Sequence, residues 1–374
     1  MKTNKFIPKK IYIERSCQDL SYTSRIINNT PGVPHELIND PRELIEEIIC
    51  LKDPIGEGKK YLMITQQKGD FVKPCPCTHH YLGCNYYVIN LDLNCPLDCS
   101  YCILQMYLSN PVITLHANKQ DLWNQLDAFL AHKKEHRIRI GTGELGDSLA
   151  LDHITENSIE LIEYFRGHKN ALFELKTKTT NIENILQLEP EENIIIAWSL
   201  NAKEIASKEE KDAPSISDRL AAAARVGANG FRTAFHFDPV IEYPGWEKGY
   251  EDVIDDLFAC IDPDRIAWIS IGSLRFPPDL KGIIKKRFPR SKIIYSEMIP
   301  GKDGKLRYFK PLRGKLYKKI TQRLLKGSEK IPYYFCMEDI DIWRNYLKKE
   351  PRSKVEIENM LTLLPGNNHI DHIK

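Results

Sequence analysis

The chain has 374 residues, of which 42% are hydrophobic and 28% are charged, and its formal net charge is +2. These values are those of a soluble globular protein with a sizeable core, in one large domain or two ordinary ones. No apolar run approaches the roughly 18 residues of a membrane span, and the first ten residues lack the apolar segment of a secretory signal. We therefore expect a cytoplasmic protein without membrane association, whose ten cysteines serve metal or redox chemistry.

The first 70 residues or so mix short elements, with a strand pattern at 10–14 and a helix pattern at 41–51. From residue 86 onward, strand-like runs alternate with helix-like stretches. The predicted strands are 86–93, 137–142, 172–177, 194–200, 231–237 and 266–271. The predicted helices are 120–133, 155–166, 217–225 and 250–261.

This alternation predicts an α/β fold built on a parallel sheet with crossover helices. Six units are too few for the closed eight-stranded barrel and suit a partial (β/α)6 barrel of the TIM type. We predict three parts: an N-terminal α/β extension (1–85), the partial barrel (86–300) and a basic C-terminal segment of helix and hairpin packed on the barrel (301–374).

Cys95, Cys99 and Cys102 follow the first strand of the repeat in the frame Cys-Pro-Leu-Asp-Cys-Ser-Tyr-Cys. A 4Fe-4S cluster ordinarily takes four thiolates, so three leave one iron open to an outside ligand. Such an iron can chelate S-adenosylmethionine and pass one electron into its sulfonium, which releases a carbon radical. The spacing therefore predicts these two cofactors. A zinc site is the alternative, because His79 and His80 lie upstream and structural zinc takes four Cys or His ligands.

Polar residues follow the next strands, and in a parallel barrel these strand ends meet at one edge. Gly143 would let a ligand approach the backbone, and Glu144 could pair with the ammonium of S-adenosylmethionine. Lys178 could neutralise the methionyl carboxylate or a substrate phosphate. The ordinary alternatives are a glycine turn with a surface glutamate, and a solvent-exposed lysine.

Three further residues extend this predicted site. Ser199 and Asn201 could bond ribose hydroxyls, although capping after a strand would explain them equally well. Tyr101 lies between two of the cysteines, where it could stack on adenine, relay an electron or simply pack the loop.

A second group of cysteines lies upstream of the first predicted strand. Cys75, Cys77 and Cys84, with Cys336 as a distant fourth ligand, could hold an auxiliary metal, or they could be structural cysteines without one.

Basic residues are concentrated between Lys302 and Lys330, where eleven Lys and Arg face two acidic residues. The local net charge of +9 leaves about −7 for the remainder of the chain. Such a segment suggests a polyanion partner, nucleic acid being the commonest. The alternative is a solvated helical face, because its cations have near-helical spacing: Lys315, Lys318, Lys319, Arg323 and Lys326.

The cysteine frame, followed by Ile103-Leu104-Gln105, resembles the radical S-adenosylmethionine superfamily and, within it, spore photoproduct lyase and its relatives. The likeness spans most of the chain. It includes Phe6-Ile7-Pro8 with Ile11-Tyr12-Ile13-Glu14, Leu151-Asp152-His153-Ile154-Thr155, Gly245-Trp246-Glu247-Lys248-Gly249-Tyr250, Arg275-Phe276 and Arg307-Tyr308.

The resemblance implies a partial barrel, a 4Fe-4S cluster on the three cysteines, and cofactor contacts at Lys178 and Ser199. It further implies that a 5′-deoxyadenosyl radical acts on a thymine dimer flipped out of damaged DNA, with a one-electron reductant such as flavodoxin or ferredoxin. A basic hairpin would wedge the duplex open, and the residues that match it are Lys305, Arg307, Tyr308 and Lys310.

Two departures from the family pattern concern the return of hydrogen to the product. Glu144 stands where the lyase has its hydrogen-donating cysteine, and Ile103 replaces the second tyrosine of its relay, although Tyr101 keeps the first. From the cysteine loop, the polar strand ends and the basic C-terminal segment, we nevertheless expect a radical S-adenosylmethionine enzyme that repairs a nucleic-acid lesion. One alternative is a radical enzyme with a substrate other than nucleic acid. Another is a zinc-containing nucleic-acid-binding protein without catalysis.

Overall fold

The computed structural model describes residues 5–78, 80–134 and 136–362. Its centre is an eight-stranded sheet in the order β18-β14-β13-β11-β10-β9-β5-β4. Neighbours from β5 to β18 are parallel, and β4 runs antiparallel to β5. The strands are β4 (Val72–Pro74), β5 (Tyr87–Ile89), β9 (Ile138–Thr142), β10 (Ala171–Thr177), β11 (Ile194–Ser199), β13 (Arg232–Val240), β14 (Ile266–Ser273) and β18 (Tyr333–Phe335).

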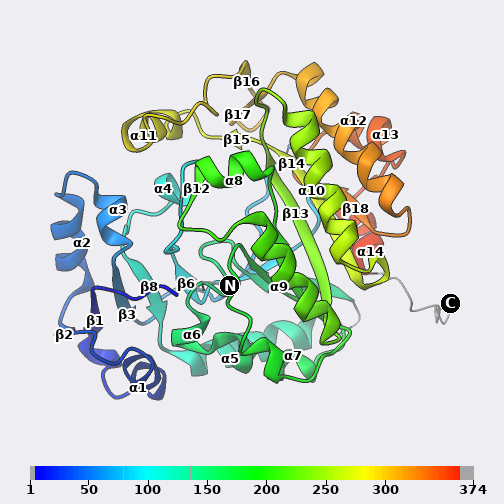
Figure 1. The fold of residues 1–374 in the computed structure, drawn as a ribbon. Coiled ribbons are helices and arrows are strands. Elements are labelled where there is room, and N and C mark those ends of the chain that lie inside the picture. Colours follow the sequence, from blue (N-terminus) through cyan, green and yellow to red (C-terminus); the bar gives the residue numbers. More distant parts are fainter. Residues whose placement is uncertain (1–4, 79, 135, 363–374) are drawn as a thin grey trace.

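This sheet curls into an open half-barrel with helices along its outside (Figure 1). The covering helices are α5 (Lys119–His132), α7 (Asn157–Arg166), α9 (Ile216–Ala228), α10 (Trp246–Cys260) and α12 (Lys310–Gly327). Strand β11 is buried along its whole length, as is typical of a parallel strand covered on both faces. The predicted partial barrel is confirmed, and the strands that match the six predicted ones lie side by side in chain order.

Two strand predictions were incomplete or wrong. Residues 86–93 do not form one strand: β5 joins the half-barrel, whereas β6 (Asp92–Leu93) pairs with β8 (Ile113–His116) in another sheet. The reason is that the chain changes pairing partners within this apolar run. Strand β18, which the sequence reasoning missed, adds a further parallel strand beside β14.

The N-terminal region forms a five-stranded sheet at the left of Figure 1, in the order β2-β1-β3-β8-β6. The predicted strand and helix in this region are confirmed as β1 (Lys10–Glu14) and α2 (Pro41–Ile49). Strands β6 and β8 come from beyond residue 86, so this sheet joins segments on both sides of the predicted boundary. The other elements here are α1 (Ser21–Asn28), β2 (His35–Ile38), α3 (Pro54–Gly58) and β3 (Tyr61–Thr65).

The C-terminal region extends from the top of the half-barrel to its right side in Figure 1 and contains a small antiparallel sheet in the order β15-β17-β16. Strands β16 (Met298–Pro300) and β17 (Leu306–Tyr308) form a hairpin, and β15 (Arg275–Phe276) pairs with β17. The helices here are α11 (Leu280–Arg287), α13 (Ile340–Leu347) and α14 (Lys354–Thr362).

Shorter elements complete the described chain. They are β7 (Asp98–Cys99), α4 (Leu104–Tyr107), α6 (Asp152–Thr155), α8 (Lys203–Glu209), β12 (Glu210–Lys211) and the 3-10 helices Arg15–Cys17, Ile185–Gln187 and Pro263–Arg265. Across 5–78, 80–134 and 136–362, none of the helices is both long and apolar enough to cross a bilayer.

The basic stripe of α12 lies against an acidic stripe of α10. Its cations are spaced four residues apart, and each meets a carboxylate of α10 with the same spacing. The pairs are Lys315 with Glu247 at 3.0 Å, Lys319 with Glu251 at 2.8 Å, and Arg323 with Asp255. For these three cations the structure favours the ordinary alternative, a solvated helical face whose charge the neighbouring helix neutralises, whereas Lys318 and Lys326 are exposed and lie outside these pairs.

Candidate active site

The three cysteines of the loop open onto one cavity of about 330 Å³. Cys95 and Cys99 are buried and Cys102 is half-buried, and the three belong to one small apolar cluster with Tyr101. Burial disfavours the thiolate, so it raises the pKa of Cys95 well above its ordinary value and that of Cys99 to about 12. Binding of a metal to these thiols therefore has to release their protons.

The loop is anchored from behind by Lys59, a residue that the sequence reasoning did not identify. Its ammonium, 6% exposed, donates hydrogen bonds to the backbone carbonyls of Cys95 at 2.9 Å and Leu97 at 2.5 Å. Asp98 lies 3.9 Å from the same ammonium and accepts two bonds of 3.1 Å from Arg287. A buried lysine thus holds the cysteine loop through its main chain.

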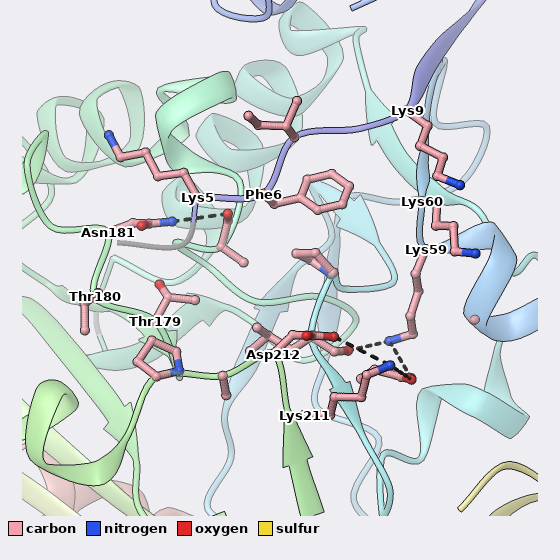
Figure 2. A pocket seen from close by; sticks show the side chains of 18 of the residues that line it. Lys5, Phe6, Lys9, Lys59, Lys60, Thr179, Thr180, Asn181, Lys211 and Asp212 are labelled. Carbon is pink, nitrogen blue, oxygen red and sulfur yellow. Dashed lines mark hydrogen bonds and ion pairs between the residues drawn. The ribbon is translucent and has the colours of Figure 1, made fainter. Parts of the chain in front are cut away.

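Behind this loop lies a second, larger hollow of about 680 Å³, lined by lysines of the N-terminal region. Figure 2 shows Lys59 entering it from one wall, opposite Thr179 and Thr180. Leu97 lines both this hollow and the cavity. The cysteine loop therefore separates the two spaces.

Four of the five predicted cofactor residues line the cavity: Gly143, Glu144, Lys178 and Ser199. Gly143 has a φ of +91°, and an added Cβ would lie 2.6 Å from the carbonyl oxygen of Lys176, so a glycine is required here. Glu144 forms an ion pair with Lys176, which therefore already neutralises its carboxylate.

Asn201 does not line the cavity, because its side chain is committed to the fold. Its amide nitrogen donates to the carbonyl of Pro239 at 3.0 Å, and its oxygen accepts from Tyr250 at 2.6 Å and from the amide of Ala202 at 3.0 Å. With the side chain 1% exposed, the predicted ribose contact is wrong and the ordinary capping alternative holds.

Tyr101 also lines the cavity, and its hydroxyl donates to Glu210, which in turn pairs with the buried Arg219. Burial raises the pKa of Tyr101, so its phenol stays protonated. The Lys178 ammonium lies 5.9 Å from the centre of the Tyr101 ring. Burial opposes the charge of Lys178, but neighbouring Cys99 and Glu210 raise its pKa above the ordinary value.

Asp147 is a second residue that the sequence reasoning missed, although it lies in the loop that follows the predicted strand 137–142. Its carboxylate accepts from the amides of Leu149 and Ala150 at 3.1 and 3.0 Å, and from the amide of Lys178 at 2.8 Å. Asp147 thereby joins the loops after β9 and β10, which carry Glu144 and Lys178.

The floor of the cavity carries a buried polar network. Glu174 accepts a hydrogen bond of 2.8 Å from His236 and one of 3.0 Å from the indole of Trp268. Burial opposes ionisation of Glu174, but His236 and Arg139 lower its pKa to about 2. Arg139 is fully buried, with its guanidinium 4.1 Å from the Trp268 ring centre. This network keeps Glu174 ionised beneath the cavity, with the cation of Arg139 close by.

The second group of cysteines lines the same cavity. Cys75 and Cys77 follow β4, Cys84 precedes β5, and Cys336 follows β18. Cys336 accepts a hydrogen bond of 3.2 Å from Arg275, which also binds both oxygens of Asp238 at 3.0 Å. Seven of the ten cysteines in the chain therefore gather around one cavity.

The three thiols of the loop line one common space without converging on a single point. Among the described residues, no three Cys, His, Asp or Glu side chains converge as one ion would require. A 4Fe-4S cube binds its thiolates through separate irons, so its ligands need only line a common space, as Cys95, Cys99 and Cys102 do. His79, considered for zinc, lies outside the described residues, and His80 is exposed.

The predicted nucleic-acid residues lie in quite different surroundings. Lys305 lines the cavity, and Lys310 is exposed but pairs with Asp341 at 3.0 Å. Arg307 and Tyr308 are fully buried: Arg307 pairs with Asp303 at 2.6 Å, and Tyr308 accepts from an amide of the β13–α10 loop. These two side chains cannot contact a phosphate or a base at the surface, and their predicted roles do not fit their positions.

Comparisons with known proteins agree with this architecture. A family model for spore photoproduct lyase matches residues 82–336. The spore photoproduct lyase of Bacillus subtilis strain 168 is 25% identical over 56% of this chain and 63% of its own length. That of Geobacillus sp. strain Y412MC61 is 24% identical over the same shares. The matched region thus spans less than two thirds of these two relatives.

Solved structures extend the likeness to nearly the whole fold. A spore photoproduct lyase complexed with dinucleoside spore photoproduct superposes with a TM-score of 0.76 at 19% identity, covering 88% of this chain and 99% of that one. A mutant with the same dinucleoside gives 0.79 at 20% identity and the same coverage. Since the family model alone covers more than half of the residues, this chain belongs to the spore photoproduct lyase family.

Proposed function

We propose that this chain is a radical S-adenosylmethionine lyase that repairs a UV-type lesion in DNA. Cys95, Cys99 and Cys102 would hold the 4Fe-4S cluster, which supplies the electron that splits the sulfonium and yields a 5′-deoxyadenosyl radical. The observation that carries the proposal is the single cavity onto which the three-cysteine loop and the polar strand ends open together.

The cavity residues suit the parts of S-adenosylmethionine. Gly143 lies in the wall of the cavity beside Glu144, and the charge of Lys178 suits a carboxylate. The Ser199 side chain faces the cavity and can bond a ribose hydroxyl. A volume of about 330 Å³ is within the range of small-molecule sites, roughly 300–1,000 Å³. To bind the ligand ammonium, the Glu144 carboxylate would have to give up its ion pair with Lys176.

The first experiment tests the cluster and the cleavage. After anaerobic reconstitution, the wild-type chain should hold about four irons and form 5′-deoxyadenosine with dithionite. Cys99→Ala should lose both properties, whereas Cys260→Ala, at an exposed cysteine outside the cavity, should keep them. Reduced flavodoxin or ferredoxin should replace dithionite. Zinc in place of iron, or a full cluster without cleavage, would contradict the proposal.

DNA would dock on a basic surface at α11, defined by Lys285, Lys286, Arg290 and Lys292. All four are exposed, and among the described residues none forms an ion pair with a carboxylate. This distinguishes them from Lys315, Lys319 and Arg323 of α12, which pair with α10. Unpaired cations are the groups that bind phosphates.

The α11 surface adjoins the cavity. Helix α11 packs on α4, whose Tyr107 lines the cavity and is 47% exposed. Next to Lys292, Tyr295 is 62% exposed and available to stack on a base. A flipped lesion could therefore enter the cavity while its flanking phosphates lie on α11.

The second experiment compares the two basic helices. Each phosphate contact contributes about 0.9 to the slope of log K against log salt for duplex DNA. Combining Lys286→Ala, Arg290→Ala and Lys292→Ala should therefore reduce the slope for irradiated duplex by about 2–3. Lys315→Ala with Lys319→Ala is the matched control and should leave it unchanged. The opposite result would place the DNA on α12, and no salt-dependent binding would favour a substrate other than nucleic acid.

A further inference from the structure

Cys75 and Cys77 form a close thiol pair within the cavity. Their sulfur atoms lie 3.6 Å apart, within hydrogen-bond distance. The amide of Cys77 donates to the carbonyl of Cys75 at 2.7 Å, so a tight turn at Pro76 brings the two side chains together. Both residues are half-buried and line the cavity shared by the three-cysteine loop.

The other two thiols of this group have different partners. Cys336 is bonded to Arg275 at 3.2 Å, and Cys84 lies near the guanidinium of Arg139. In the described part of the chain, the Cys75–Cys77 contact is the one close sulfur–sulfur contact of the cavity.

The charges around the pair give the two thiols different protonation states. The hydrogen bond with Cys77, burial and the charge of Glu144 all raise the pKa of Cys75, so it keeps its proton. The same hydrogen bond, together with Arg275 and Lys354, lowers the pKa of Cys77 to about 7 despite its burial. Near neutral pH the pair thus contains one thiol and, in part, one thiolate.

A carbon radical formed in this cavity must finish by gaining a hydrogen atom. Thiols and tyrosine phenols are the side chains of the cavity whose bonds to hydrogen are weak enough to supply it, and polar effects make a thiol the faster donor to a carbon radical. Tyr101 is a poorer source because its hydroxyl is committed to Glu210, and the carboxylate of Glu144 has no hydrogen atom to give.

Resting on the proposed function, we propose that Cys75 and Cys77 are a redox-active pair that returns a hydrogen atom to the substrate radical and ends each turnover as a disulfide.

The chemistry balances in three steps. The substrate radical takes the hydrogen atom from the Cys75 S–H, which leaves a thiyl radical. The Cys77 thiolate adds to this thiyl and forms a disulfide radical anion. The anion gives one electron to the oxidised carrier protein, of the flavodoxin or ferredoxin class, and becomes a neutral disulfide.

The carrier thereby recovers the electron that it spent on splitting the sulfonium. Each turnover converts one S-adenosylmethionine and one dithiol into methionine, 5′-deoxyadenosine and one disulfide. A small dithiol reductant then restores the pair by thiol–disulfide exchange. S-adenosylmethionine is consumed rather than regenerated. Each repair therefore uses one dithiol reductant as well as one S-adenosylmethionine.

The test uses the reconstituted holoenzyme with dinucleoside spore photoproduct and reduced flavodoxin in D₂O, without added thiol. Wild type should form one Cys75–Cys77 disulfide per 5′-deoxyadenosine, seen by alkylation and peptide mass spectrometry, and should place one deuterium in the repaired thymine. Cys75→Ser should still form 5′-deoxyadenosine but lose the deuterated product, and Cys77→Ser should form no disulfide. Cys260→Ser, at an exposed cysteine, should match wild type.

A measurement on the chain without cofactors avoids any dependence on turnover. Oxidised dithiothreitol should link Cys75 to Cys77 reversibly, leaving Cys84 and Cys336 open to alkylation.

The outcomes separate the two proposals. Absence of 5′-deoxyadenosine in wild type would overturn the proposed function and the catalytic role of the pair with it. Normal cleavage and repair in Cys75→Ser and Cys77→Ser would overturn the pair alone. So would a disulfide between Cys84 and Cys336, or extra iron or zinc that these variants lose.

Discussion

Lys59→Met should destabilise the cysteine loop without disturbing the rest of the fold. Methionine keeps most of the apolar stem and removes the ammonium, so the carbonyls of Cys95 and Leu97 lose their donor inside the protein. A hydrogen bond to a charged group contributes about 1.5–3 kcal/mol, and removing a buried charge returns part of its desolvation cost. Asp98 keeps Arg287 as a partner, which limits the loss.

The expected net effect is a decrease of about 2–4 kcal/mol in the free energy of unfolding. Urea unfolding of the chain without cofactors, followed by circular dichroism, measures it. The reconstituted variant should also lose iron to a chelator several-fold faster than wild type, because the loop that holds the thiols is less ordered.

Lys60→Met is the matched control. Lys60 is the next residue, is 39% exposed, and pairs with Glu57 at 2.5 Å. An exposed pair of this kind contributes at most about 1 kcal/mol. If Lys59→Met unfolded within about 0.5 kcal/mol of Lys60→Met and retained iron equally well, the anchoring role of Lys59 would be refuted.

Three further predictions concern the cavity and its rim. Gly143→Ala should lower the free energy of unfolding by about 1–3 kcal/mol because of the positive φ and the nearby Lys176 carbonyl. Gly282→Ala in α11, with open space around it, should raise that free energy by about 0.5–1 kcal/mol. Equal unfolding midpoints of the two variants would contradict both predictions. The pKa of Glu174 in the folded chain, about 2, lies below its ordinary 4.5, so its ionisation stabilises the fold above pH 4.5 and this contribution is lost as the pH falls toward 2. Glu174→Gln should therefore lose stability at neutral pH and show a flatter dependence on acid in urea titrations; an unchanged acid slope would disprove this. Iodoacetamide should alkylate Cys77 with a midpoint near pH 7 in the chain without cofactors. Cys75→Ala should raise this midpoint because it removes the hydrogen bond to the Cys77 sulfur, and a midpoint that stays the same would count against the pairing.

Local sequence patterns were sufficient for the half-barrel and the cysteine loop. The apolar runs of β9, β10, β11, β13 and β14 are buried parallel strands, and such strands can be recognised from their composition and length alone. Cys95, Cys99 and Cys102 lie within one short loop. Their spacing therefore predicts a shared site without any knowledge of the fold. Gly143, Glu144 and Lys178 were predictable because they follow strands whose ends meet at one edge.

Contacts between distant segments were decided by the tertiary structure. Lys59 reaches the cysteine loop from α3, and α10 neutralises the basic stripe that suggested a polyanion site on α12. Arg307 looked like a surface cation but is buried against Asp303. Periodicity reports which face of an element is apolar, but it does not report which other element covers that face or which charge meets it. The gathering of Cys75, Cys77 and Cys336 around one cavity depends on such pairings, because β4 and β18 lie at opposite edges of the sheet that curls around it.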